Sequence, residues 1–371
     1  MRILIAPDKF KGSLRAEAVG QSIGRGLQAA LPEVELEFVP LADGGEGTTE
    51  TICRAAGGEL LSCRVHDALG REISARYAWL PDSRLVVCEM SAAAGLAQLA
   101  PTERDPLRAS TFGVGEMLHA ALARQPREIV IGLGGSATND GGFGLARALG
   151  FRFFDRDGRA LAGAVSDLLQ LARIEAPNEL ALPPITAACD VNNPLLGPHG
   201  ATRTFGPQKG ATPEQLEILE RSLARLAEVA RRNLQRDHGE VAGAGAAGGL
   251  GFGLLTFCNA RIRSGFEVVA DATCLRAKIA RADIVITGEG KLDRQTLTGK
   301  GPAGVAQLAR AAGKPVFAIA GEATEDAEVR QLFDGVTTLR GTCPDHSDTA
   351  QMLELRAREL ALSEDVFRAI P

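Results

Sequence analysis

The sequence of 371 residues is poor in features that mark several large protein classes. It has one tryptophan and one tyrosine, too few for the aromatic platforms on which single-stranded nucleic acids stack. Its formal net charge of -5 provides no broad basic field for nucleic acid or an anionic membrane. No apolar run approaches the roughly 18 residues that suggest a membrane span. We therefore expect neither nucleic-acid nor membrane partners.

The cysteines and histidines argue against common structural sites. The seven cysteines are odd in number and include no Cys-x-x-Cys pair, so we expect neither a disulfide framework nor a zinc site. The five histidines have no metal-ligand spacing. Reduced thiols, and an N-terminal segment without the long apolar core of a signal peptide, predict a cytoplasmic protein. The P-loop pattern GxxxxGKS/T and the serine nucleophile pattern GxSxG are both absent.

Glycine, by contrast, is abundant, with 43 residues that cluster directly after short apolar runs. Runs such as residues 3–6, 128–131 and 283–286 read as buried strands, and segments with helical spacing of apolar residues lie between several of them. Strands that alternate with helices are typical of a parallel α/β sheet. Two local signals predict helix starts. One is Ser13, a favoured N-cap residue, and the other is a capping box at Thr212 and Gln215 with Pro213 at the first helical position.

The order of these patterns along the chain predicts the domain organisation. The length suggests two domains. Both chain ends carry the α/β pattern, whereas residues 59–90 read as antiparallel strands with turns at 69–70 and 81–82. We therefore predict one discontinuous α/β domain formed by residues 1–60 and 262–371, with residues 61–261 inserted as a second α/β domain.

The residues that follow the predicted strands are of the types that bind anions and metal ions. Ligands of open α/β sheets bind beyond the carboxyl ends of the strands, and here almost every such end carries Gly, Asp, Glu or Lys. Glycine loops let backbone amides wrap an anion, lysines add positive charge, and carboxylates bind Mg²⁺ or accept a proton. The pattern Gly243-x-Gly245-x-x-Gly248 matches the dinucleotide fingerprint in its letters only, because no clear strand precedes it.

Seven segments, in order across almost the full length, resemble the bacterial glycerate kinase family of two α/β domains without a P-loop. They are APDKFKGS (6–13), ADGGEGT (42–48), IGLGGSATNDGG (131–142), CDVNNPLLG (189–197), FGPQKGA (205–211), GAAGGLGFG (245–253) and TGEGKLDRQTLTGKGP (287–302). The resemblance implies ATP-dependent phosphorylation of D-glycerate with Mg²⁺. It also implies a flavodoxin-like domain built from both termini, an inserted α/β domain, and a site in the cleft between them. It favours the 2-phosphate product, while the sequence itself leaves the attacked hydroxyl open.

The matching motifs suggest roles that we state as hypotheses. Asp190 is the first choice for the base that accepts the proton of the glycerate hydroxyl, and Asp293 is the second. Lys9, Lys11 and Lys291 would bind phosphate or the glycerate carboxylate, with Lys291 also a catalytic candidate. Asp43 and Glu289 are candidate ligands of Mg²⁺. The remaining candidates for substrate or phosphate binding are Ser13, Gly134, Gly135, Ser136, Thr138, Asn139, Asn193, Gly288 and Gly290.

Other readings remain open at this point. The same scaffold could phosphorylate another small hydroxy or sugar acid. A dehydrogenase would use the glycine segment at 243–248, and a non-catalytic sensor would bind an acidic metabolite through the glycine loops. The sequence also leaves open which loop binds the nucleotide and whether the chain forms a homo-oligomer.

Overall fold

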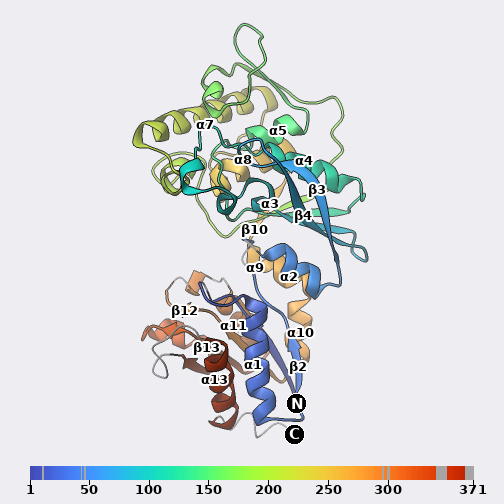
Figure 1. Ribbon diagram of the computed structural model, residues 1–371, viewed down its shortest axis with the longest axis vertical. Helices are drawn as coiled ribbons and strands as arrows, with labels where there is room; N and C mark the ends of the chain where they lie inside the picture. Colours follow the sequence, from blue (N-terminus) through green and yellow to red (C-terminus); the bar gives the residue numbers. More distant parts are fainter. Residues whose placement is uncertain are drawn as a thin grey trace. The chain divides into compact units, whose positions relative to one another are not determined.

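A computed structural model describes residues 1–10, 12–42, 44–45, 47–294, 296–298, 301–339 and 349–363 (Figure 1). The chain divides into two compact units. Unit 1 comprises Met1–Asp43 and Phe266–Pro371, and unit 2 comprises Gly44–Gly265. Unit 1 is thus formed by both chain ends. The predicted boundaries, after residues 60 and 261, are close to this division but not identical, because the helix α2 (Thr48–Ala55) contacts the strands of unit 2. That these units are independent domains stays a prediction.

Unit 1 contains a five-stranded parallel sheet in the order β15-β13-β11-β1-β2. Counted along unit 1 alone, this is the strand order 2-1-3-4-5 of flavodoxin-like folds, with its switch point between β1 and β11. The strands are β1 (Arg2–Pro7), β2 (Glu35–Phe38), β11 (Ile284–Gly288), β13 (Val316–Ala320) and β15 (Gly335–Thr338). A short parallel pair, β12 (Lys291–Leu292) with β14 (Glu322–Ala323), follows two of their carboxyl ends.

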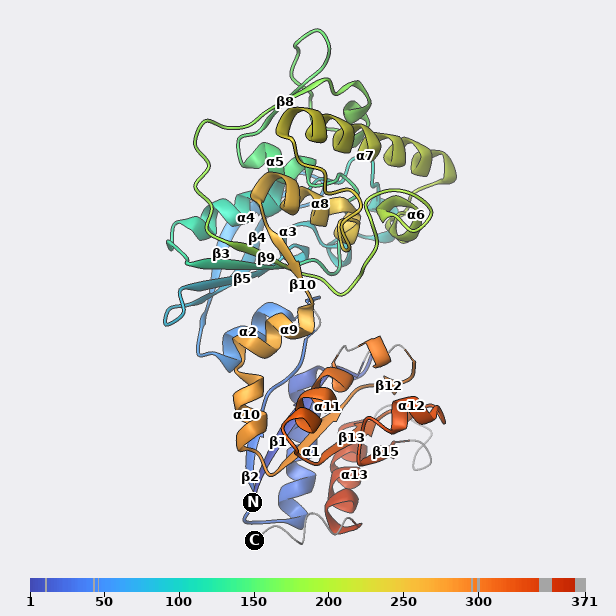
Figure 2. The same ribbon diagram turned by 180° about the vertical axis from the view of Figure 1, so that it is seen from behind.

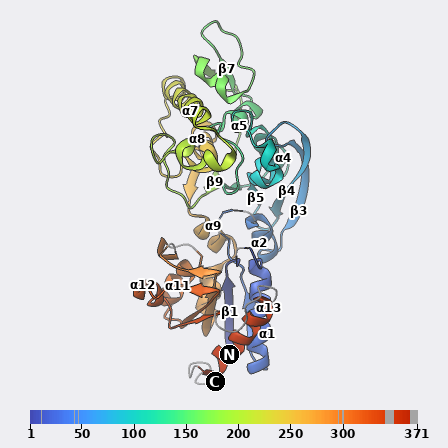
Figure 3. The ribbon, with the colours of Figure 1, turned by 60° about the vertical axis from the view of Figure 1, so that its left-hand side comes forward.

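Helices cover both faces of the unit 1 sheet because its strands alternate apolar side chains between two cores. Ile3 and Ile5 point into the core under α1 (Ala16–Ala30) and α13 (Thr349–Ser363), which lie side by side (Figure 3). Leu4 and Ala6 belong to the core on the other face. The helices of that face are seen in Figure 2. Those helices are α9 (Gly265–Ala272), α10 (Leu275–Arg281) and α11 (Pro302–Ala311), and the short α12 (Ala327–Arg330) precedes β15.

Unit 2 contains a six-stranded sheet in the order β10-β9-β6-β5-β4-β3. Strands β10, β9, β6 and β5 are parallel, and β4 is antiparallel to both of its neighbours, β5 and β3. The predicted antiparallel segment at 59–90 is confirmed. Its strands are β3 (Glu59–His66), β4 (Glu72–Leu80), β5 (Leu85–Glu89), β6 (Glu128–Gly132), β9 (Ile185–Ala188) and β10 (Arg261–Arg263), with a separate hairpin of β7 (Arg152–Phe154) and β8 (Arg173–Glu175).

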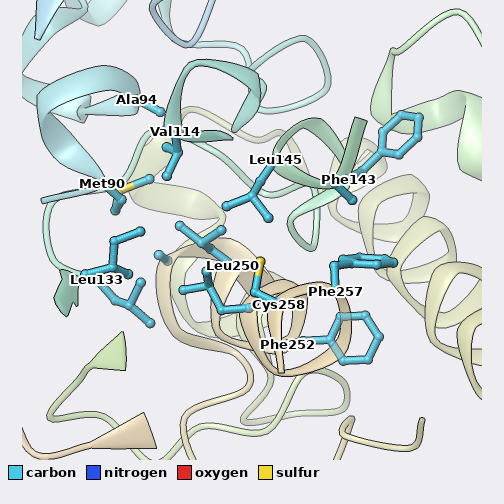
Figure 4. Packing of buried hydrophobic residues seen from close by; sticks show 14 of the residues in the cluster. Met90, Ala94, Val114, Leu133, Phe143, Leu145, Leu250, Phe252, Phe257 and Cys258 are labelled. Carbon is cyan, nitrogen blue, oxygen red and sulfur yellow. The ribbon is translucent and has the colours of Figure 1, made fainter. Parts of the chain in front are cut away.

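The core of unit 2 is built around a helix that is buried on all sides. Every residue of α8 (Ala246–Cys258) is buried, which matches its lack of polar residues apart from Thr256. Figure 4 shows side chains of this helix, among them Leu250 and Phe252, packed in one cluster with side chains of neighbouring elements. Phe143 and Leu145 face the helix from across this cluster. The other helices are α3 (Ser91–Ala94), α4 (Phe112–Leu122), α5 (Phe143–Ala148), α6 (Ala201–Phe205) and α7 (Pro213–Leu234).

The two predicted helix starts have different outcomes. The capping box of α7 is confirmed, since Thr212 Oγ1 accepts a hydrogen bond from the Gln215 amide and the Gln215 side chain accepts one from the Thr212 amide. The predicted start near Ser13 is wrong, because α1 begins at Ala16. Phe10 and Leu14 pair with each other, which turns the chain before the helix can start. Among the described residues, no helix is long and apolar enough to cross a membrane.

Candidate active site

The glycine-rich loop after β6 presents unpaired backbone amides at the carboxyl edge of the unit 2 sheet. Its outer side is fixed by two hydrogen bonds to the segment after α3, from Leu96 N to Gly135 O (2.8 Å) and from Ala137 N to Ala94 O (2.9 Å). Within the described part of the chain, no hydrogen bond is donated by the amides of residues 134, 135, 136 or 138. Gly134 is half-buried and Gly135 is exposed, so an anion can reach this end of the loop.

A second glycine loop packs directly against the first. A β-carbon at Gly132 would come within 2.4 Å of Gly44 O, and one at Gly134 within 2.5 Å of Gly45 Cα, so only glycine permits this approach. Glu89, at the end of β5, fixes the far side of the second loop. Its carboxylate accepts hydrogen bonds from the amides of Gly47 (3.2 Å) and Thr49 (2.7 Å) at the start of α2. This carboxylate caps the amino end of that helix, where negative charge is favourable.

A lysine lies beneath the glycine-rich loop. Lys209 is 1% exposed, and its Nζ donates hydrogen bonds to Ser136 Oγ (2.7 Å) and to the Thr138 carbonyl oxygen (2.7 Å). Burial lowers the pKa of Lys209 to about 7, and the charge of Asp140 acts in the opposite direction. Asp140 is itself buried, and burial raises the pKa of its carboxyl although it accepts four hydrogen bonds, two from Thr111 and two from backbone amides.

Of the candidates in this loop, two are too deeply buried to meet a ligand at the protein surface. Thr138 and Asn139 have no exposed area. Asn139 Nδ2 donates to Thr202 Oγ1 at 3.0 Å, whereas Thr138 Oγ1 and Asn139 Oδ1 are buried without a hydrogen-bond partner among the described residues. Gly134, Gly135 and Ser136 are therefore the part of the loop that can hold an anion directly.

Asp190 lies at the neighbouring strand end, directly after β9, which pairs with β6. Its Oδ1 accepts hydrogen bonds from Ser264 Oγ (2.9 Å) and from the Gly265 amide (3.0 Å), both just after β10. The side chain is half-buried and held in one orientation. Asn193 lies three residues after Asp190 and stabilises the following loop, because its Nδ2 donates a hydrogen bond to His199 O at 2.7 Å. Asp190 and the amides of the glycine-rich loop thus share one sheet edge.

The remaining candidates belong to unit 1, where they follow the two strands at the switch point. Lys9 follows β1, and Glu289 and Lys291 follow β11, so parallel pairing of Pro7 with Gly288 brings these segments side by side. Gly288 and Gly290 belong to the same segment, in which Glu289 Oε1 accepts a hydrogen bond from Thr296 Oγ1 (2.9 Å). Lys291 Nζ lies 3.4 Å from Asp293 Oδ2, in an ion pair whose lysine side chain is 60% exposed.

Three candidates of unit 1 are separate from this group or cannot be placed. Ser13 Oγ donates to Thr349 Oγ1 at 2.7 Å, so its hydroxyl links the turn before α1 to the start of α13. Lys11 and Asp43 lie outside the described residues. No group of three or more His, Cys, Asp or Glu side chains suited to a metal occurs in the described ranges.

Sequence reasoning missed Lys209 and Glu89 as members of this site. Lys209 belongs to the segment FGPQKGA, which was recognised as a motif but given no role, and the lysine is 73 residues from Ser136. Glu89 lies at the end of an apolar strand, and the same kind of position made Asp190 a candidate. Glu89 was not considered because residues 59–90 were interpreted only as antiparallel strands. A search for charged residues at every strand end would have found Glu89.

Comparison with known proteins agrees with this arrangement. Residues 3–370 match the sequence model of the glycerate kinase family. The chain belongs to the glycerate kinase family. It is therefore a kinase, and membership of a kinase family implies the use of ATP.

Similar proteins match over most of their length. The chain is 39% identical to the glycerate kinase of Bacillus subtilis (strain 168), over 98% of this chain and 97% of that one. It is 42% identical to the glycerate 2-kinase of Escherichia coli (strain K12), over 89% and 87%. A crystal structure from Salmonella typhimurium LT2, assigned as a glycerate kinase 2, superposes with a TM-score of 0.88 at 41% identity and covers both chains completely. The predicted mixed α/β fold with parallel sheets is confirmed.

Proposed function

We propose that the protein transfers the terminal phosphoryl group of ATP to the 2-hydroxyl of D-glycerate, which gives ADP and 2-phosphoglycerate. The observation that carries the proposal is the shared sheet edge of unit 2, where Asp190 and the amides of Gly134 and Gly135 follow two paired strands in a member of the glycerate kinase family. The choice of the 2-hydroxyl is supported by the name of the Escherichia coli relative, glycerate 2-kinase.

Asp190 acts in this proposal as the base. A kinase needs a carboxylate that accepts the proton of the attacking hydroxyl while donors stabilise the transferred phosphoryl group. Two hydrogen bonds to Asp190 Oδ1 keep the carboxylate in one orientation. Asp293 is the second candidate, but its ion pair with Lys291 occupies one of its oxygens.

The amides of the glycine-rich loop and the lysines bind the anionic groups. Amides at residues 134–136 fit a phosphate or carboxylate, while Lys9, Lys11 and Lys291 supply positive charge. Mg²⁺, which neutralises phosphate charge in such reactions, would be held by Glu289 and Asp43 together with nucleotide oxygens. The proposal places the reaction in the cytoplasm, where the six cysteines of the described residues, all free thiols, would stay reduced.

The test is release of ADP by the purified protein with Mg-ATP, with and without D-glycerate. Release that depends on D-glycerate is expected, and phosphorus NMR of the product then shows which hydroxyl carries the phosphate. A matched panel with L-glycerate and other small hydroxy or sugar acids serves as the control. Stimulation by a different acid would keep the kinase and replace the substrate. Nucleotide binding without turnover on any acceptor would contradict the proposal and favour a sensor.

A further inference from the structure

The lysine beneath the glycine-rich loop is costly to bury. Lysine is almost never fully buried without a partner, and removal of an ammonium group from water is expensive even in a hydrogen-bonded site. Lys209 nevertheless has 1% exposure in the short 3-10 helix at Pro207–Lys209, beside Gly210. An apolar side chain of similar volume would fill the space at lower cost. The charge or the donors of Lys209 must therefore serve something other than packing.

The hydrogen-bond partners of Lys209 indicate what that is. An ammonium group has three donors and no acceptor, so Ser136 Oγ must accept the bond from Nζ. The hydroxyl hydrogen of Ser136 then points away from Lys209 and can be donated to another acceptor. A neutral amine, by contrast, carries a lone pair that can accept this hydrogen. The ammonium form of Lys209 thus keeps the Ser136 hydroxyl available as a donor to a ligand at the amides of residues 134 and 135, whereas the neutral amine can compete for it.

The second bond of Nζ acts on the loop backbone. Donation to the Thr138 carbonyl oxygen fixes the peptide of Thr138 and Asn139 at the buried end of the loop. The charged residue that acts on this lysine is Asp140, whose carboxylate favours the ammonium form. Arg104 packs against the neighbouring Gly210. Lys209 thus supports the loop from its buried side, while the other side of the loop offers donors to an anion.

We propose that Lys209 is a positioning residue of the kinase reaction, which in its ammonium form orients the Ser136 hydroxyl and the loop amides toward a bound oxyanion of the substrate. The oxyanion is the glycerate carboxylate or an ATP phosphate, and both share the chemistry that the loop recognises. This inference rests on the proposed function, since it assigns the anion-binding role within the same site.

The role has a consequence for protonation. An anion bound at the loop stabilises the ammonium form, so binding of the anion and of a proton to Lys209 reinforce each other. Because the pKa of Lys209 lies near 7 without ligand, the lysine is mostly neutral at about pH 8, and a bound anion should cause proton uptake. The affinity for that anion should fall as the pH rises above about 7, while below that pH it should be constant.

The first experiment needs no variant. Calorimetric titration of the wild-type protein at about pH 8, in buffers of different ionisation enthalpy, measures protons taken up on binding of D-glycerate and, separately, of Mg-ATP. Glycerate is fully ionised at this pH, so its proton uptake cannot come from the ligand. Uptake of a substantial fraction of one proton with one ligand is expected and identifies the anion. Absence of uptake with both ligands would overturn the proposal.

The second experiment compares Lys209→Met, Ser136→Ala and the double variant in the full-length enzyme. Loss of a hydrogen bond to a charged group should raise the KM of the affected substrate roughly tenfold or more, with a smaller change in kcat and in the KM of the other substrate. The pH dependence of that KM should disappear. Because both residues act through one contact, Lys209→Met should have less effect in the Ser136→Ala background.

The outcomes separate this inference from the proposed function. A folded Lys209→Met variant with normal KM values and an unchanged pH profile would make Lys209 structural and overturn the role. If that variant does not fold, the wild-type proton uptake and the pH profile of Ser136→Ala still decide. Failure of glycerate to bind or react, with proton uptake on Mg-ATP binding intact, would contradict the substrate but support Lys209.

Discussion

At the residue scale, the sharpest prediction concerns Asp190. The substitution Asp190→Asn keeps the shape of the side chain and an oxygen for Ser264 and Gly265, but it removes the group that can accept a proton. A general base contributes about 10²- to 10⁴-fold, so kcat should fall by that factor while the KM values change little. Steady-state ADP release at saturating substrates measures this.

The matched control for Asp190→Asn is Ser264→Ala, which removes one hydrogen bond to the carboxylate and leaves the base itself. It should lower kcat far less than Asp190→Asn does. Near-normal turnover of Asp190→Asn would contradict the assignment and transfer the role of base to Asp293.

What the sequence could predict about these residues depended on the range of the interaction. Asp190 and Gly134 follow apolar strands, and every such position in a parallel sheet lies at the ligand-binding edge. Lys209 has no comparable local signal. A single lysine between Gln208 and Gly210 reads as exposed, and only the tertiary contact with Ser136 gives it a role.

At the element scale, the kinked start of α8 supports the glycine-rich loop. Ala247, Gly248 and Gly249 have left-handed backbone conformations, and a β-carbon at Gly248 would come within 1.9 Å of the Thr138 carbonyl oxygen. That oxygen accepts the bond from Lys209. Gly248 therefore permits the contact between the two motifs that the sequence showed only as separate glycine clusters.

The substitution Gly248→Ala should destabilise unit 2. Backbone strain costs about 1–2 kcal/mol and overpacking about 1–3 kcal/mol, so we expect a loss of about 2–5 kcal/mol in the free energy of unfolding. Trp79, the single tryptophan, lies in β4 and reports on unit 2 by fluorescence during urea unfolding. Gly239→Ala is the control, because nothing lies within 4 Å of its β-carbon. Equal stability of the two variants would refute the close contact.

Local and tertiary signals also explain why one helix start was predicted and another was not. The capping box of α7 is complete within Thr212 and Gln215, so the sequence alone specifies it. At α1, Ser13 has the right residue type, but the pairing of Phe10 with Leu14 forms a turn first and delays the helix to Ala16. Propensity is a weak prior where such a contact competes with it.

At the scale of the whole molecule, both chain ends combine in one sheet. β1 pairs with β11 from Ile3 with Ile284 to Pro7 with Gly288, across more than 270 residues of chain. The alternation of strands and helices at both ends was sufficient to predict a shared domain, because buried parallel strands need neighbours on both sides. The residue at which the chain passes from unit 1 to unit 2 was not predictable. It depends on the packing of α2 against β4 and β5, which no local sequence pattern indicates.

The buried ionisable groups should also shape how global stability depends on pH. The pKa of Lys209 is about 7 in the folded protein against an ordinary value of 10.5, so between these values the unfolded chain binds more protons. Stability must therefore rise with pH in this window, by at most about 1.4 kcal/mol per pH unit. The buried thiol of Cys258 has the opposite effect, because burial raises its pKa from 9.0 to about 12 and favours unfolding above pH 9.

Comparison of the wild type with Lys209→Met from about pH 7 to about pH 8.5 isolates the lysine, because the other titrating groups are common to both proteins. Urea unfolding monitored by Trp79 fluorescence should show that the free energy of unfolding of the wild type increases across this window relative to the variant. The variant should be the more stable protein at the lower pH, where the buried ammonium is most costly, and the difference should narrow as the pH rises. Parallel curves for the two proteins would mean that Lys209 keeps an ordinary pKa in the folded state, and the argument for a proton-linked loop would fail with it.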